Sequence, residues 1–122
     1  MIDTSCWIEY FRHYESEVAE RIETLILEDR AATTGIVLSE LLQGARTNAE
    51  MSRIGASLEA LVWVETDERL YARAGEIGFK LRRKGVTIPI TDCIVAAAAE
   101  SAGGNLLTLD GHFGEIDSLD LL

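Results

Sequence analysis

Residues 89–110 read PITDCIVAAAAESAGGNLLTLD, and this stretch decides the fold class. Its alanine-rich part predicts a buried helix over residues 92–102, which the glycine pair that begins at Gly103 terminates. The apolar run over residues 105–109 predicts a buried strand, and Asp110 stands directly after it. A helix that leads into a short apolar strand is part of a βαβ unit, so the stretch indicates a parallel sheet in an α/β protein.

The same alternation continues in both directions from this stretch. Strands are expected at residues 1–2, 31–34, 61–64, 105–109 and 119–122. Helices are expected around Trp7, Ile8 and Phe11 and at residues 15–27, 36–44, 48–60, 67–84 and 92–102, the last capped by Thr91. No linker or repeat interrupts the chain, so residues 1–122 are expected to form a single domain, with Trp63 in its core.

Several protein classes are excluded by the composition. No stretch approaches the roughly 18 apolar residues that a membrane span requires. The two cysteines, Cys6 and Cys93, are too few for a disulfide framework and lack the spacing of a zinc site. The N-terminus has no basic lead before an apolar run, as a signal peptide would have. A cytoplasmic location is therefore expected.

The charge balance is strongly acidic, with 21 Asp and Glu against 11 Lys and Arg and a net charge of -10. A protein that bound nucleic acid by neutralising phosphates alone would be basic. The chain therefore avoids nucleic acid, binds a basic protein partner, or uses divalent cations and a local basic patch for contact. The one basic cluster, Arg82, Arg83 and Lys84, either binds RNA phosphates or favours the C-terminus of its helix.

Four acidic residues are candidates for catalysis. Asp3 follows the first expected strand and Asp110 follows the fourth. Asp92 opens the helix beside them. Ligands of doubly wound sheets bind beyond the carboxyl ends of the strands, where these residues stand. Glu40 lies within the apolar residues 36–42, where a lone carboxylate must be paired, protonated or metal-bound.

Carboxylates gathered in one place suit Mg²⁺, a hard ion that binds oxygen and often completes its shell with substrate phosphate. Such an ion lowers the pKa of a bound water and offsets charge on phosphorus. With His13 and His112 as the only histidines, a histidine-pair mechanism is poorly supported. Structural roles stay open for each acid: Asp3 and Asp92 as helix-terminus residues, Asp110 as a turn residue and Glu40 as a surface residue.

Four segments resemble the acidic motifs of the PIN-domain family. They are, in order, residues 2–8 (IDTSCWI), residues 39–41 (SEL) with Gly44, residues 91–97 (TDCIVAA), and residues 107–110 (LTLD) with Phe113. The resemblance covers essentially the whole chain, and length and motif style are most similar to VapC-type toxins of bacterial toxin–antitoxin pairs.

This resemblance implies a three-layer α/β/α sandwich around a central parallel sheet of four to five strands. It implies that Mg²⁺ or Mn²⁺ is held by Asp3, Glu40, Asp92 and Asp110, and that a metal-activated water cleaves RNA endonucleolytically. It also implies a homodimer that a VapB-type antitoxin neutralises. Three hydroxyl residues become candidates for orienting carboxylates or waters: Thr4, Ser5 and Thr91.

The chain departs from the family pattern at two points. His112 stands where members often have a second acid, and we expect an exposed turn residue there rather than a phosphate contact. The segment before Asp3 is also shorter than usual. The aromatic residues Trp7, Tyr10, Phe11 and Tyr14 are explained by core packing or by a docking surface for the antitoxin.

Two other functions compete with the ribonuclease. A phospho-acceptor receiver-like domain needs an Asp after the third strand and a late lysine. Here Val64 is followed by Glu65 and Thr66, and no lysine follows Lys84. A catalytically inactive PIN binding module is disfavoured by the presence of all four acids.

Overall fold

The computed structural model describes residues 1–122, and its elements follow the expected order. They are α1 (Thr4–Arg12), α2 (Glu17–Leu27), β1 (Ala32–Thr34), α3 (Gly35–Gln43), α4 (Asn48–Glu59), β2 (Val62–Val64), α5 (Glu68–Arg83), α6 (Ile90–Ser101), β3 (Asn105–Leu106), the 3₁₀ helix η1 (Gly111–Glu115) and β4 (Asp120–Leu121). The sequence did not predict η1. None of the helices has the length and apolar character that crossing a bilayer requires.

The strands form two short parallel ladders, β1 with β2 and β3 with β4. The N-terminal segment lies between them: the Ile2 amide donates to the Ala32 carbonyl at 3.1 Å, and the Asp3 amide donates to the Leu107 carbonyl at 2.9 Å. Ile2 and Leu107 form a parallel bridge. The order is therefore β2, β1, N-terminal segment, β3, β4, and both ladders and the Ile2–Leu107 bridge are parallel.

The expected fourth strand, residues 105–109, is shorter than predicted. The strand β3 ends at Leu106, and the Leu107 amide still donates to the Met1 carbonyl at 2.9 Å, but the amides of Leu109 and Asp110 bond to side chains. The Leu109 amide donates to the Ser5 hydroxyl at 3.1 Å, and the Asp110 amide donates to the Thr108 hydroxyl at 2.9 Å. Side-chain hydroxyls thus take the place of backbone hydrogen bonds between strands where the chain approaches the acidic residues.

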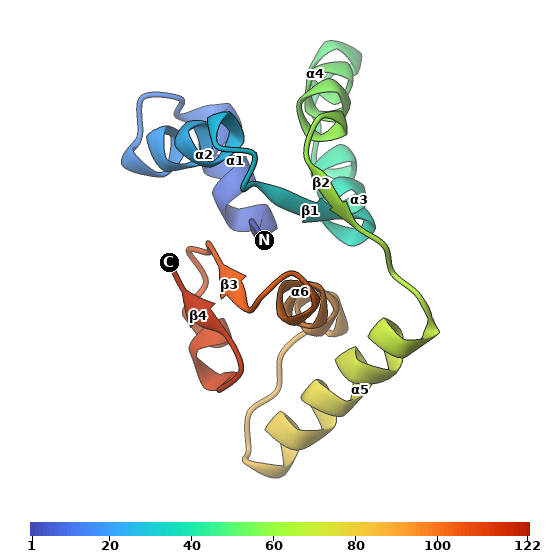
Figure 1. The fold of residues 1–122 in the computed structure, drawn as a ribbon. Coiled ribbons are helices and arrows are strands. Elements are labelled where there is room, and N and C mark those ends of the chain that lie inside the picture. Colours follow the sequence, from blue (N-terminus) through green and yellow to red (C-terminus); the bar gives the residue numbers. More distant parts are fainter.

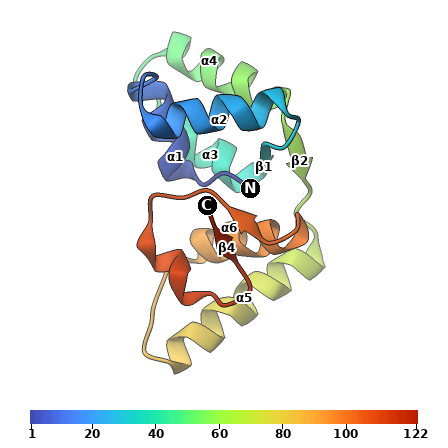
Figure 2. The ribbon, with the colours of Figure 1, turned by 60° about the vertical axis from the view of Figure 1, so that its left-hand side comes forward.

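Helices cover both faces of the strands, as a three-layer α/β/α sandwich requires (Figures 1 and 2). Helices α1 to α4 lie on one side, while α5 and α6 lie on the other. Residues 95–99 of α6 are all buried, which explains the alanine-rich sequence there. The helix α5 packs along α6 and buries one stripe at helical spacing, namely Leu70, Ala74, Ile77 and Leu81.

Two local predictions were wrong. Trp63 is 38% exposed rather than in the core, because β2 is an edge strand, and its indole N–H donates to the Leu58 carbonyl at 2.9 Å. The helix α6 begins at Ile90 rather than after Thr91, since the Pro89 carbonyl accepts the first backbone hydrogen bonds of the helix. Its cap is therefore Pro89, and Asp92 lies within the first turn.

Candidate functional site

Asp3 is a buried carboxylate, with 5% of its surface exposed, held between the first helix and the end of β3. Its Oδ2 accepts hydrogen bonds from the Ser5 hydroxyl at 2.8 Å and from the Thr108 hydroxyl at 2.9 Å. Although Asp3 occupies the N-cap position of α1, its side chain makes no capping hydrogen bond. The carboxylate is thus fixed by hydroxyls, and Oδ1 has no protein hydrogen-bond partner.

Asp110 is joined to Asp3 through Thr108. The Thr108 hydroxyl that donates to Asp3 also accepts the Asp110 amide. Oδ1 of Asp110 accepts the His112 amide at 2.9 Å, so this residue does cap η1, and His112 Nδ1 lies 2.9 Å from the same oxygen. His112 is exposed, as the sequence suggested, yet it contacts a candidate site residue.

Glu40 reaches the same region from α3. Its side chain is half-buried, and Oε1 accepts a hydrogen bond from the Thr4 hydroxyl at 2.9 Å. This bond connects α3 to the first turn of α1, one residue after Asp3. The contact between α3 and α6 brings the helix of Glu40 against the helix of Asp92.

The pKa of Asp92 is raised by burial and by the charges of the other three acids. Burial and then the charges of Asp3, Asp110 and Glu40, in that order, raise its pKa from 3.8 to about 6. The charge of His112 acts in the opposite direction. Charges raise a pKa in this way when they lie nearby in a poorly solvated place. The other three acids, distant in the sequence, are thus near enough to Asp92 for their charges to act on its carboxyl group.

A divalent cation fits the chemistry of these donors. They are all oxygens, and a buried carboxylate such as Asp3 with an uncommitted oxygen is costly without a counter-charge. No three His, Cys, Asp or Glu side chains are arranged to form a metal cluster by themselves. Mg²⁺ does not require one, because it commonly binds through one or two carboxylates and retains several waters.

The remaining predicted residues divide into two groups. Thr4 and Ser5 bond directly to candidate acids, whereas Thr91, though next to Asp92, makes no side-chain hydrogen bond to them. The basic residues 82–84 lie exposed at the C-terminal end of α5, outside these hydrogen bonds. Sequence reasoning missed Thr108. A polar residue inside the apolar run 106–109, two positions before Asp110, is the signal that could have identified it.

The chain was compared with known families, proteins and structures. The family model described as PIN domain matches residues 1–119. Ribonuclease VapC11 of Mycobacterium tuberculosis is 31% identical over 120 residues, which cover 95% of this chain and 90% of that protein. Ribonuclease VapC5 of the same organism is 30% identical over 127 residues, covering 96% and 87% respectively.

Solved structures show the same fold. VapBC2 from Rickettsia felis, bound to a promoter DNA fragment, contains a chain that superposes with a TM-score of 0.86 at 23% identity, covering 100% of this chain and 96% of that one. VapBC-1 from nontypeable Haemophilus influenzae gives a TM-score of 0.83 at 24% identity, covering 100% and 95%.

Proposed function

This chain belongs to the PIN-domain family, and from that premise we propose that it is the metal-dependent endoribonuclease toxin of a toxin–antitoxin pair. The observation that carries the proposal is the shared environment of Asp3, Glu40, Asp92 and Asp110, which raises the pKa of Asp92 to about 6. Relatives that are 30–31% identical over almost the whole chain are named as VapC ribonucleases.

In the proposed site the acids bind the ion, and hydroxyl side chains orient the acids. When Mg²⁺ or Mn²⁺ is bound by the acids, it supplies activation of water and neutralisation of charge on the phosphorus. Ser5 and Thr108 fix Oδ2 of Asp3, which leaves Oδ1 for a ligand. Thr4 orients Glu40 in the same way. Preorganised oxygens hold their geometry without reorganisation during the reaction.

We propose a VapB-type antitoxin as the protein partner, because the similar solved structures are those of VapBC2 and VapBC-1. A groove beside Glu40 is lined by apolar residues of α1 and α4, including Ile8, Phe11 and Ile54. An apolar segment of the antitoxin that docked there would end beside the acids, where a basic side chain would be attracted. We propose further that the protein forms a homodimer and that it acts on RNA in the cytoplasm.

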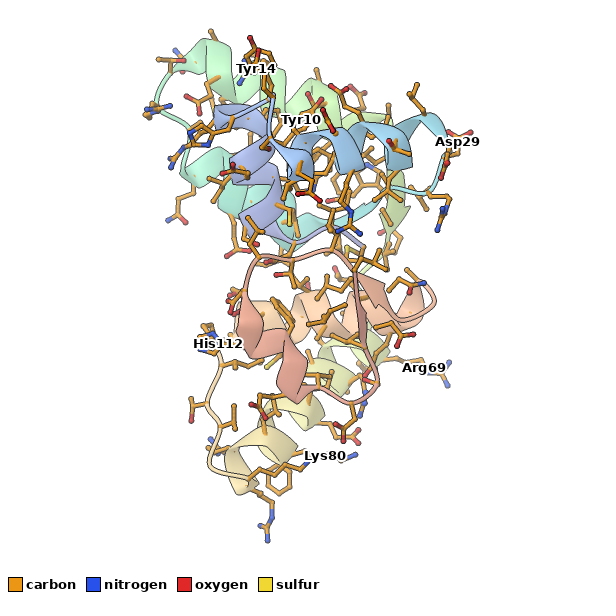
Figure 3. The ribbon with its side chains drawn as sticks, turned by 90° about the vertical axis from the view of Figure 1, so that its left-hand side faces the viewer. Tyr10, Tyr14, Asp29, Arg69, Lys80 and His112 are labelled. Carbon is orange, nitrogen blue, oxygen red and sulfur yellow. The ribbon has the colours of Figure 1, made fainter.

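RNA cleavage tests the proposed activity. The purified protein is incubated with RNA in Mg²⁺ or Mn²⁺, and Asp3→Asn and Asp92→Asn are compared with it. Each should lose more than about 100-fold in rate, since the loss of an outer-shell partner alone costs 10–100-fold. Asp29→Asn is the matched control, because Asp29 is exposed on the opposite side of the molecule from His112 (Figure 3).

Three results would contradict the proposal. Cleavage that both Asn variants retain would show that the activity does not use these acids. A wild-type protein that bound no Mn²⁺ by calorimetry would instead point to a PIN module that has lost catalysis. Transfer of phosphate from a small phosphodonor to the protein would favour the receiver-like alternative.

A further inference from the structure

Most of the cationic side chains are already engaged with other groups. Those in ion pairs are Arg30, Arg46, Arg73, Lys80 and Lys84. Arg53 donates to the Phe11 carbonyl and lies over the Phe11 ring. Of the cations left without a carboxylate, only Arg82 and Arg83 are adjacent in the chain, and both are exposed. Arg82 and Arg83 are therefore two consecutive cations at the C-terminal end of α5 that no carboxylate neutralises.

An exposed aromatic ring accompanies these arginines. Phe79 is 51% exposed, and the guanidinium of Arg83 lies over its ring, 5.6 Å from the centroid. Arg83 is one helical turn after Phe79, so both side chains share a face of α5. A half-exposed aromatic ring with a cation beside it is the combination that stacks nucleic-acid bases and binds their phosphates.

The same end of α5 follows directly on the point where α5 contacts the helix of Asp92. A Cβ placed on Gly78 would lie 3.2 Å from Sγ of Cys93, so the two helices are in close contact there. Cys93 follows Asp92 directly. Arg82 is one turn beyond Gly78 on the same face, a rise of about 6 Å along the axis. The free arginines thus begin about one helical turn from the point where α5 contacts the helix of Asp92.

We propose that Phe79, Arg82 and Arg83 form a binding site for single-stranded RNA at the C-terminal end of α5, one helical turn beyond its contact with the helix of Asp92. Phe79 stacks on a base, and the two arginines bind the adjacent phosphates. The inference rests on the proposed ribonuclease function and gives it a substrate contact of its own. Lys84 is not part of this site, because it lies 3.9 Å from Asp117.

Charge complementarity favours RNA as the occupant. With a net charge of -10 the protein repels a polyanion on average, so local cations must offset that repulsion where the strand passes. A simpler explanation is that these arginines only complement the dipole at the C-terminus of α5. That role would change stability and leave RNA binding unaffected, which makes the two explanations separable.

Fluorescence anisotropy tests the site in a background that cannot cleave, Asp92→Asn with Mg²⁺. The probe is a labelled 12-nucleotide single-stranded RNA of mixed sequence. Phe79→Ala should weaken binding about tenfold, as expected for the loss of one stacked base. Arg82→Ala with Arg83→Ala should reduce the slope of log affinity against log salt by about 1.4, or about 0.7 for each phosphate.

Arg69→Ala is the matched control, since Arg69 is also exposed and unpaired but lies near the start of α5, apart from Lys80 (Figure 3). It should leave affinity and salt slope unchanged, and Phe79→Tyr should retain binding. Melting temperatures verify that each variant is folded. Wild-type affinity and slope in the folded arginine variant would overturn the proposal, as would an equal loss in Arg69→Ala.

Failure of this site and failure of the proposed function give different results. If the wild type cleaves RNA while the Phe79 and arginine variants bind it normally, the binding site is wrong and the ribonuclease stands. If the arginine variant loses RNA binding but the wild type cleaves no RNA in Mg²⁺ or Mn²⁺, the binding site stands without the catalytic function.

Discussion

Three hydroxyl side chains determine how the acids are presented. Ser5 and Thr108 donate to one oxygen of Asp3, and Thr4 donates to Glu40. Because Thr108 also accepts the Asp110 amide, one hydroxyl positions two candidate ligands. Carboxylates held in this way keep their orientation when a cation or a substrate arrives.

Replacing Thr108 tests this arrangement. Thr108→Val keeps the side-chain shape but leaves Asp3 with one donor fewer and the Asp110 amide without its partner. We expect Mn²⁺ affinity to fall about tenfold and the free energy of unfolding to fall by about 1–2 kcal/mol. Calorimetry and urea unfolding measure the two effects. Thr108→Ser retains the hydroxyl and should behave like the parent; equal losses in both variants would contradict the role of the hydroxyl.

The raised pKa of Asp92 makes stability depend on pH. The metal-free folded protein holds this proton more tightly than the unfolded chain does, so the stabilising contribution is complete below pH 3.8 and is lost as the pH rises through about 6. Asp92→Asn cannot ionise. At pH 7.5 it should exceed the parent in stability by about 1 kcal/mol, a value reduced because the group is partly solvated.

Urea unfolding in EDTA at pH 4.5, 6.0 and 7.5 measures this difference. The advantage of Asp92→Asn should shrink toward the lowest pH. A constant difference across the series would mean that repulsion among the acids does not act on Asp92.

At the scale of elements, the contact between α5 and α6 determines where the first turn of α6 lies. The glycines at 75 and 78 both belong to α5, but only Gly78 is in close contact with α6, at Cys93. A Cβ at 78 would lie 3.2 Å from Cys93 Sγ, so a large side chain there is crowded against α6, whereas a Cβ at 75 meets nothing within 4 Å.

Substitutions at these two glycines should therefore have opposite effects. Gly75→Ala should stabilise the protein by about 0.5–1 kcal/mol, because alanine favours the helix interior. Gly78→Leu should destabilise it by about 1–3 kcal/mol through overpacking against Cys93. Thermal and urea unfolding measure both effects, and loss of stability in Gly75→Ala would show that this position is more crowded than the structure indicates.

At the scale of the whole molecule, the net charge of -10 and the gathered acids make folding sensitive to divalent ions. Monovalent salt screens the general repulsion, but only an ion bound between the carboxylates offsets the local repulsion at Asp92. Divalent and monovalent salts should therefore differ at equal ionic strength.

Thermal unfolding should reveal this difference. Mn²⁺ at about ten times its Kd should raise Tm by roughly 5 °C over NaCl of matched ionic strength, since binding adds about 1.4 kcal/mol. Combining Asp3→Asn with Asp92→Asn should remove the increment, while Asp29→Asn should retain it. An increment that survives the double substitution would place the ion elsewhere.

The sequence by itself determined the order of the elements and the identity of the acids. Periodicity is local: apolar residues at helical spacing in α5 and the alanine-rich run of α6 predict buried helices wherever the chain goes. The pattern around Asp3, Glu40, Asp92 and Asp110 suggested a site and a family. The PIN-domain match to residues 1–119 confirms the family. The roles of the four acids remain predictions.

Only the tertiary structure decided how those acids interact. The shared hydroxyl of Thr108, the raised pKa of Asp92 and the contact of His112 with Asp110 depend on segments that are far apart in the sequence or on exact side-chain placement. The exposure of Trp63 depends on β2 being at the edge of the sheet. Local patterns cannot specify these features, because burial and electrostatic coupling arise from neighbours that only folding brings together.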